Sequence, residues 1–156
     1  PEIGERIALS RQVRRREIGY GDFDRNNPMT RLLDGDWNAR TTVEFVQKYV
    51  EEHYMDEVIL GDLALVAHVS PSYLSTRFKK ETGASFTEYL IRYRVNKAKN
   101  LLKEKQNRCR EVAENVGYKD YAQFSKIFKK YVGLSPKEYQ RMALEEENQY
   151  KHKKSE

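Results

Sequence analysis

Apolar side chains recur every three or four residues from position 43 onward, which is the spacing of an amphipathic helix. Val43, Val46, Tyr49 and Val50 share one face of a helix that ends near His53. The two threonines before Val43 can cap this helix. The pattern therefore predicts a first helix over about 41–53.

Two more helices follow from the same spacing. A short helix is predicted to begin near Asp62, with Leu63 and Val66 turned inward. A long helix is predicted from Ser85 to about Lys105, because no proline or glycine interrupts that stretch. Its expected buried positions are Phe86, Tyr89, Leu90, Tyr93, Ala98, Leu101 and Leu102.

A helix between these two carries the clearest end signals. Ser70 is suited to cap its start, and Pro71 takes the first helical position, where its missing N–H costs nothing. Gly83 is suited to the left-handed conformation that ends a helix. No run of alternating apolar residues is long enough for a strand, so the predicted fold is all-α.

Comparison of the chain with itself shows an internal repeat. At a shift of 50 residues, Leu74-Ser75, Phe78-Lys79-Lys80 and Gly83 return as Phe124-Ser125, Phe128-Lys129-Lys130 and Gly133. Leu63-Ala64 matches Val112-Ala113 at a shift of 49 residues. Each copy reads as a short helix, a tight turn and a second helix, so the sequence predicts two helix-turn-helix subdomains joined by the long helix.

The surface of each second helix favours contact with nucleic acid over a purely structural bundle. Small, polar and cationic side chains lie between the apolar ones, a composition suited to a groove floor flanked by phosphates. The 21 residues of the predicted linking helix would span roughly 30 Å. Neighbouring major-groove segments on one side of B-DNA are about 34 Å apart, so one chain could reach both.

Charge adds to this picture. Lys and Arg number 29 against 24 Asp and Glu, a net charge of +5. The excess lies in residues 39–141, while residues 1–38 balance and residues 142–156 carry −1. A basic helical region is expected where a protein meets a polyanion, although a solvated lysine-rich surface gives the same count.

The ends of the chain differ from its middle. Residues 1–38 are expected to be a poorly structured linker or the remnant of an upstream regulatory domain, since glycines and a proline interrupt their apolar pattern. Residues 142–156 are expected to form a charged tail, which is expected to fray from Glu145 onward because it has little to bury. No stretch is apolar enough to cross a membrane, and no secretory leader is seen, so a cytoplasmic location is expected.

The residues offer little for catalysis. Cys109 is the single cysteine, which excludes an internal disulfide and a multi-thiolate zinc site. His53, His68 and His152 show no ligand spacing. We therefore expect no enzymatic activity, no metal and no cofactor, with Cys109 packed as a small apolar side chain. Four tyrosines are expected to face the core rather than stack on bases, namely Tyr73, Tyr89, Tyr93 and Tyr139.

About two-thirds of the chain, residues 40 to 141, resembles the DNA-binding domain of AraC/XylS-type transcription regulators. The second copy carries that family's signature in Val112-Ala113, Val116-Gly117-Tyr118, Asp120, Phe124-Ser125, Phe128-Lys129-Lys130, Gly133, Ser135-Pro136 and Tyr139. The first copy supports it with Leu63-Ala64, Ser70, Tyr73-Leu74-Ser75, Phe78-Lys79-Lys80, Gly83, Ser85-Phe86, Tyr89-Leu90 and Arg94.

The resemblance implies roles for particular residues. Base readers would be Ser72, Ser75 and Thr76 in the first recognition helix and Tyr121, Ala122, Ser125 and Lys126 in the second. Phosphate contacts would fall to Arg77, Lys79, Lys80, Lys129, Lys130 and Ser135, while Asp120 would cap the second recognition helix. The family often has arginine and then an apolar residue where this chain has Thr76-Arg77, so Arg77 is expected to point toward the DNA backbone.

The resemblance also implies a function. The leading hypothesis is a sequence-specific regulator of transcription that binds double-stranded DNA, acts as an activator and contacts RNA polymerase. The alternative is a helical protein-interaction module that has lost DNA binding, which the displaced arginine would favour. A DNA-repair fusion would need a cysteine cluster, which a single cysteine excludes.

Overall fold

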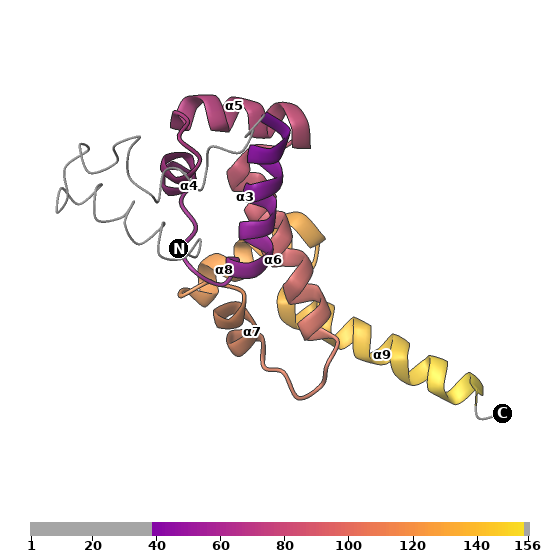
Figure 1. Cartoon of the computed structure of the whole chain (residues 1–156). Helices are drawn as coiled ribbons and strands as arrows, with labels where there is room; N and C mark the ends of the chain where they lie inside the picture. Colours follow the sequence, from indigo (N-terminus) through magenta and orange to yellow (C-terminus); the bar gives the residue numbers. More distant parts are fainter. Residues whose placement is uncertain (1–38, 155–156) are drawn as a thin grey trace. The chain divides into compact units, whose positions relative to one another are not determined.

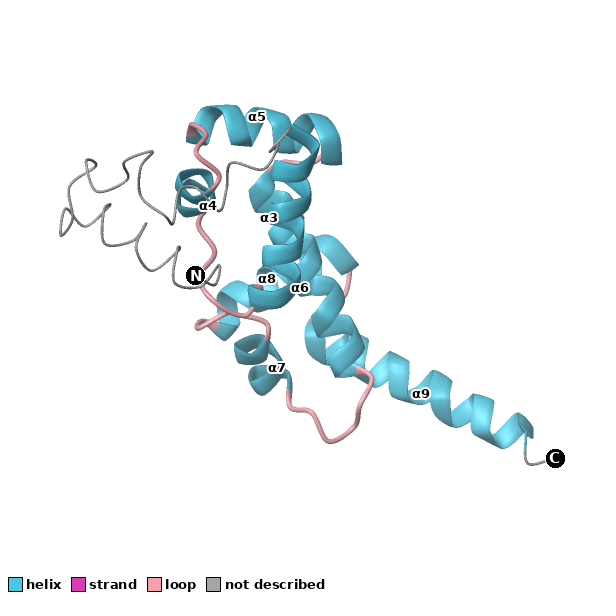
Figure 2. Ribbon diagram, in the orientation of Figure 1, coloured by secondary structure: helices cyan, strands magenta, loops and turns pink. Residues whose placement is uncertain are grey.

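The computed structural model describes residues 39–154, and every regular element within them is an α-helix (Figure 2). The helices are α3 (Ala39–His53), α4 (Leu60–Val66), α5 (Pro71–Thr82), α6 (Phe86–Leu102), α7 (Cys109–Asn115), α8 (Tyr121–Val132) and α9 (Pro136–Lys154) (Figure 1). The predicted all-α class is confirmed for this part of the chain. The linker predicted over residues 1–38 lies outside the described residues.

The described residues divide into two compact units. The first unit holds residues 39–52 and 58–86, and the second holds residues 53–57 and 87–154. We call residues 53–57 the connector, since they join α3 to α4 but belong to the second unit. Each unit contains one helix-turn-helix pair, α4 with α5 and α7 with α8, and α6 is the long helix that follows the first pair.

The first unit is built on apolar side chains at the predicted positions. Val46 and Val50 of α3 are fully buried, as are Leu63 of α4 and Leu74 and Phe78 of α5. At the end of the unit, the rings of Phe78 and Phe86 meet edge to face with centroids 5.7 Å apart. Edge-to-face packing of this kind adds to the apolar burial.

The second unit has an aromatic core. Phe124 and Phe128 of α8 are fully buried, with ring centroids 5.6 Å apart. Tyr118 lies 5.4 Å from Phe124, and Tyr139 of α9 lies 5.6 Å from Phe128. Val95 of α6 is also buried in this core, although the sequence analysis did not single it out.

α5 and α8, the second helices of the two pairs and the predicted recognition helices, each begin at a side-chain cap and end at a glycine. The two copies of the repeat therefore agree at both ends of these helices. The Ser70 hydroxyl accepts the Tyr73 backbone N–H at 3.1 Å, and the Asp120 carboxylate accepts the Ala122 N–H at 2.9 Å. Gly83 and Gly133 end the two helices in the left-handed conformation, with φ of 79° and 88°. The two predicted caps and the predicted glycine ending at Gly83 are confirmed.

The linking helix is shorter than predicted. α6 ends at Leu102 rather than near Lys105, which leaves 17 residues and a length of about 26 Å. Beyond Leu102, turn hydrogen bonds replace the helical ones, since the Glu104 N–H donates to the Leu101 carbonyl at 3.3 Å. The Asn107 side-chain amide donates to the same carbonyl at 2.9 Å and adds to this helix ending.

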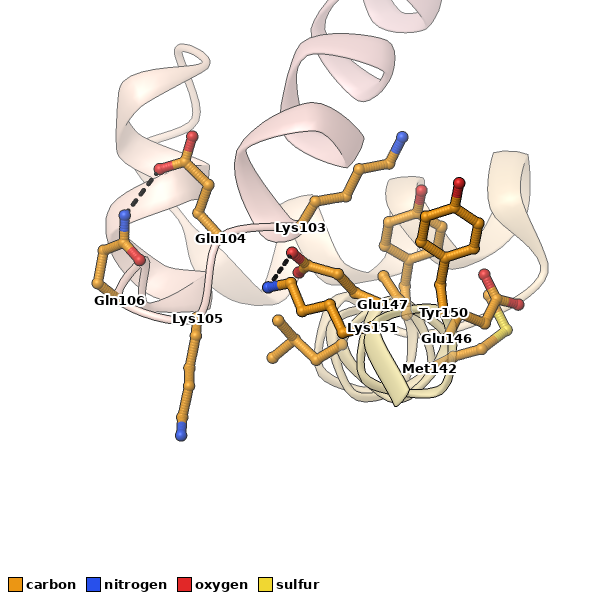
Figure 3. Close-up of a pocket in the computed structure, with 12 residues that line it drawn as sticks. Lys103, Glu104, Lys105, Gln106, Met142, Glu146, Glu147, Tyr150 and Lys151 are labelled. Carbon is orange, nitrogen blue, oxygen red and sulfur yellow. Dashed lines mark hydrogen bonds and ion pairs between the residues drawn. The ribbon is translucent and has the colours of Figure 1, made fainter. Parts of the chain in front are cut away.

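The tail is helical rather than frayed, which corrects the prediction for the residues after Glu145. α9 runs on to Lys154, and Glu147 and Lys151 form an ion pair at 2.7 Å along it (Figure 3). Glu, Gln and Lys residues are frequent in this stretch and favour helix without tertiary packing. The described residues contain no helix long and apolar enough to cross a membrane.

The start of α9 is a capping box. Glu138 accepts the backbone N–H of Ser135 at 2.8 Å, and the Ser135 hydroxyl accepts the Glu138 N–H at 3.3 Å. Hydrogen bonding of the Glu138 carboxyl to the Ser135 backbone N–H first, and then to the Ser135 side chain, lowers the pKa of that carboxyl, and Lys129 and Arg141 lower it further.

Replacement of Asp120 by alanine is expected to lower the free energy of unfolding by about 1 kcal/mol, because the Ala122 N–H loses its acceptor. Urea denaturation followed by circular dichroism measures this loss. The control is Lys119→Ala at the exposed neighbouring position, which should change stability by less than about 0.5 kcal/mol. Equal stability of the Asp120→Ala variant and the wild type would contradict the capping role.

The capping box also predicts a pH dependence. A carboxyl whose pKa is lowered by folding stabilises the protein above its ordinary pKa of about 4.3, and this contribution is lost as pH falls through the lowered value. Thermal melts of the wild type and Glu138→Gln should therefore differ near neutral pH and converge in acid. A difference that stays constant between pH 7 and pH 3 would refute this assignment.

Candidate nucleic-acid interface

The exposed face of α5 is set by its buried face. Leu74 and Phe78 are one turn apart and fully buried. At about 100° per residue, Ser72, Ser75 and Thr76 point roughly 80–180° away from the centre of that buried face. All three are exposed, as predicted for base readers, and they carry short hydroxyl side chains.

Arg77 lies beside the buried face instead. Its guanidinium forms an ion pair with Glu81 at 2.6 Å along the same helix, and its side chain is half-buried. A phosphate would have to compete with the Glu81 carboxylate for this group. The predicted phosphate contact of Arg77 remains a prediction.

The exposed face of α8 repeats the geometry of α5. Ala122 and Lys126 are exposed and Ser125 is half-buried, on the side away from Phe124 and Phe128. The structure thus brings three of the four predicted readers of α8 onto one face. A lysine takes the place that a threonine holds in α5, since Lys126 matches Thr76 in the repeat.

Tyr121 departs from this face. It is half-buried against the second core, with its ring 6.2 Å from Phe124 and the Arg110 guanidinium 5.9 Å from the ring. Burial raises the pKa of its hydroxyl. Its helical angle, about 60° from Phe124, accounts for this position. Its predicted role as a base reader remains a prediction.

Two pairs of lysines occupy the last turns of the recognition helices. Lys79 and Lys80 of α5, and Lys129 and Lys130 of α8, are all exposed. No ion pair within residues 39–154 uses any of the four, although Lys130 lies 5.8 Å from the Tyr131 ring centroid. A lysine near a helix C-terminus also interacts favourably with the helix dipole. That interaction needs one lysine, so it does not explain why both helices carry two.

Ser135 is engaged by the capping box described above. Its backbone N–H points to Glu138, so the helix start has one donor fewer for a phosphate than predicted. Cys109 is half-buried against the second core, its thiol lies 3.6 Å from the Gln140 amide oxygen, and burial raises its pKa. A raised thiol pKa disfavours the reactive thiolate.

Sequence reasoning misplaced one residue of this surface. Tyr73 was expected to face the core, but 45% of it is exposed, whereas Tyr139 is buried and Tyr89 and Tyr93 are half-buried. Tyr73 follows Ser72 on α5 and lies three residues from Thr76. The helical angle of Tyr73, about 100° from Leu74, was the available signal.

A family model described as a helix-turn-helix domain matches residues 63–142, just over half of the chain. The HTH-type transcriptional activator Btr of Bacillus subtilis is 36% identical over 98 residues, which cover 63% of this chain and 18% of Btr. Other curated relatives are also much longer, since the matched part covers 15% of one and 41% of another.

Solved structures agree with these relatives. The C-terminal domain of the two-component response regulator yesN from Fusobacterium nucleatum is 40% identical, with a TM-score of 0.59 over 62% of this chain and 95% of that one. The DNA-binding domain of AdpA, solved in complex with a target DNA, is 27% identical, with a TM-score of 0.61 over 65% of this chain and 91% of that one. With its repeated helix-turn-helix pairs, the chain belongs to the AraC-type family of helix-turn-helix transcription regulators.

Proposed function

We propose that this chain binds a two-block site in double-stranded DNA by inserting α5 and α8 into neighbouring major-groove segments. The observation that carries the proposal is the repeated face. In each recognition helix a buried apolar pair one turn apart turns small and cationic side chains outward. Small side chains let a helix approach the base edges, and cations beside them meet the phosphates.

Base discrimination is assigned mainly to α8. A lysine such as Lys126 suits the two acceptors on the major-groove edge of guanine, and an alanine methyl such as that of Ala122 suits the methyl group of thymine. The hydroxyls of Ser72, Ser75 and Thr76 both donate and accept, so they discriminate weakly between bases. Ser125 and Tyr121 complete the proposed readers, the latter through its exposed edge.

Affinity is assigned to the phosphate contacts. Lys79, Lys80, Lys129 and Lys130 would clamp the backbone on both recognition helices, because a phosphate contact releases counterions whatever the sequence. Arg77 and Ser135 would add contacts only where a phosphate replaces Glu81 or Glu138 as their partner.

α6 lies between the two helix-turn-helix pairs along the chain. Its 17 residues span about 26 Å, and the groove segments repeat every 34 Å or so. Two reading helices on one chain raise the effective concentration of the second once the first is bound.

The wider assignment follows the relatives. We propose that the whole protein activates transcription in the cytoplasm, contacts RNA polymerase, and carries a regulatory domain upstream of this one. Btr is named an activator, the yesN domain comes from a response regulator, and the curated relatives extend well beyond the matched part. The domain would act by binding alone, without catalysis or a cofactor.

Selection from a random duplex library tests the proposal. The chain should enrich two short blocks about one helical turn apart, with binding that weakens steeply as salt rises. No enrichment and salt-insensitive binding would support the protein-interaction module instead.

Two lysines of α8 then separate base reading from phosphate binding. Lys129→Ala should weaken binding similarly on all sequences and reduce the salt slope by about one unit. Lys126→Ala should relax the preference at one or two base pairs, which repeated selection with the variant measures. Uniform weakening by Lys126→Ala would remove it from the base readers.

A further inference from the structure

Arg94 of α6 holds the connector within the second unit. Its Nε–H donates to the Tyr54 backbone carbonyl at 2.6 Å, and its Nη2 donates to the Asp56 carbonyl at 2.7 Å. The guanidinium carbon of Arg94 lies over the Tyr118 ring, 5.4 Å from its centroid. One side chain therefore joins the connector to the turn between α7 and α8.

That turn is shaped to receive the connector. A Cβ built on Gly117 would lie 3.0 Å from the carbonyl oxygens of both Tyr54 and Met55, and 3.1 Å from Arg94 Cζ. Contacts this short with backbone atoms cannot be relieved by turning a side chain. The absence of a side chain at Gly117 therefore lets the connector backbone approach the turn, and a larger residue would push it away.

The first copy of the repeat provides an internal comparison. His68 occupies the place of Gly117 at the shift of 49 residues, and the two turns share the same hydrogen bonds one for one. Both residues have positive φ, 56° for His68 and 97° for Gly117. The value at His68 lies in the left-handed region that non-glycine residues can adopt, whereas the value at Gly117 lies beyond it. Backbone conformation and the approach of the connector therefore both favour glycine at position 117.

Tyr118 links the Arg94 contact to α8. Its buried ring packs against Phe124 of α8 with centroids 5.4 Å apart, and Asp120, two residues later, caps that helix. A displaced Tyr118 would shift both the start of α8 and its main core contact.

Arginine suits this position for a physical reason. Its planar fork donates to two carbonyls at once while the cation lies over an aromatic ring, and it stays charged when half-buried. Burial lowers the pKa of Arg94, and the nearby Tyr118 and Asp56 oppose that shift. A lysine ammonium offers neither the fork nor the flat face.

We propose that Arg94 is a positioning residue for DNA recognition by α8. It fixes the connector against the Gly117–Tyr118 turn and so sets the orientation in which α8 offers Ala122 and Lys126 to the bases. This inference rests on the function proposed above. Arg94 contacts the turn that comes directly before α8. Loss of Arg94 should therefore affect the DNA block that α8 reads and not the block that α5 reads.

Footprinting of the full chain on its selected two-block site tests the proposal. Arg94→Lys and Arg94→Met should each lose protection over the α8 block and keep protection over the α5 block. Their overall affinity should fall about tenfold or more, with the lysine variant the milder. Arg92→Met is the matched control, because Arg92 lies on the same helix, is more exposed and pairs only with Glu88 among the described ion pairs.

Gly117→Ala approaches the same contact from the other side. Its matched control is Gly83→Ala at the end of α5, which has a similar φ of 79° but open space around the added Cβ. Both variants strain the backbone, so only the first should lose the α8 block selectively. Combined with Arg94→Met, Gly117→Ala should add little further loss, because both remove one contact.

Circular dichroism separates positioning from folding. The variants should keep wild-type helicity at the binding temperature while they lose the α8 footprint. Wild-type footprints in the folded Arg94→Lys variant, or equal weakening over both blocks, would overturn the proposal for Arg94 alone. A wild-type chain that protects no block would instead overturn the proposed function.

Discussion

Burial of two side chains one helical turn apart determines how each recognition helix is presented. Leu74 with Phe78 and Phe124 with Phe128 are completely buried, so neither helix can rotate about its axis without exposing a large apolar side chain. Exposure of one such side chain would cost about 1.5–3 kcal/mol. The outward faces are therefore fixed by the inward ones, and the candidate interface is a consequence of the core.

The two copies use this principle differently. α5 offers short hydroxyls outward, whereas α8 offers Lys126 and is preceded by a turn that Arg94 fastens to the connector. In the first copy the matching turn carries His68, which is exposed. The helix that follows the Arg94 contact is also the one to which we assign most of the base discrimination.

Much of this arrangement was predictable from local signals. The 50-residue shift located both helix pairs, and Ser70, Pro71 and Gly83 located the ends of α5, because capping and left-handed glycines depend on a few neighbouring residues. The fate of side chains beside a buried face was harder to predict. Tyr73 and Tyr121 lie on such flanks, and one is exposed while the other packs inward.

Long-range contacts were beyond sequence reasoning. The hydrogen bonds of Arg94 span about 40 residues. Arg77 forms its ion pair with Glu81 on the same helix. The sequence spacing does not show whether Glu81 or a phosphate would be the preferred partner of Arg77. Gly117 was recognised as part of a motif, but its φ of 97° and the approach of the connector, which give the physical reasons for a glycine there, come from the structure.

The most direct test of two-site reading is a change in the spacing of the selected DNA blocks. Insertion of five base pairs turns the second block to the opposite side of the duplex, about half a helical turn away. A single chain that reads both blocks should then lose most of its affinity and retain protection of one block only. Unchanged affinity and two intact footprints after the insertion would contradict the account.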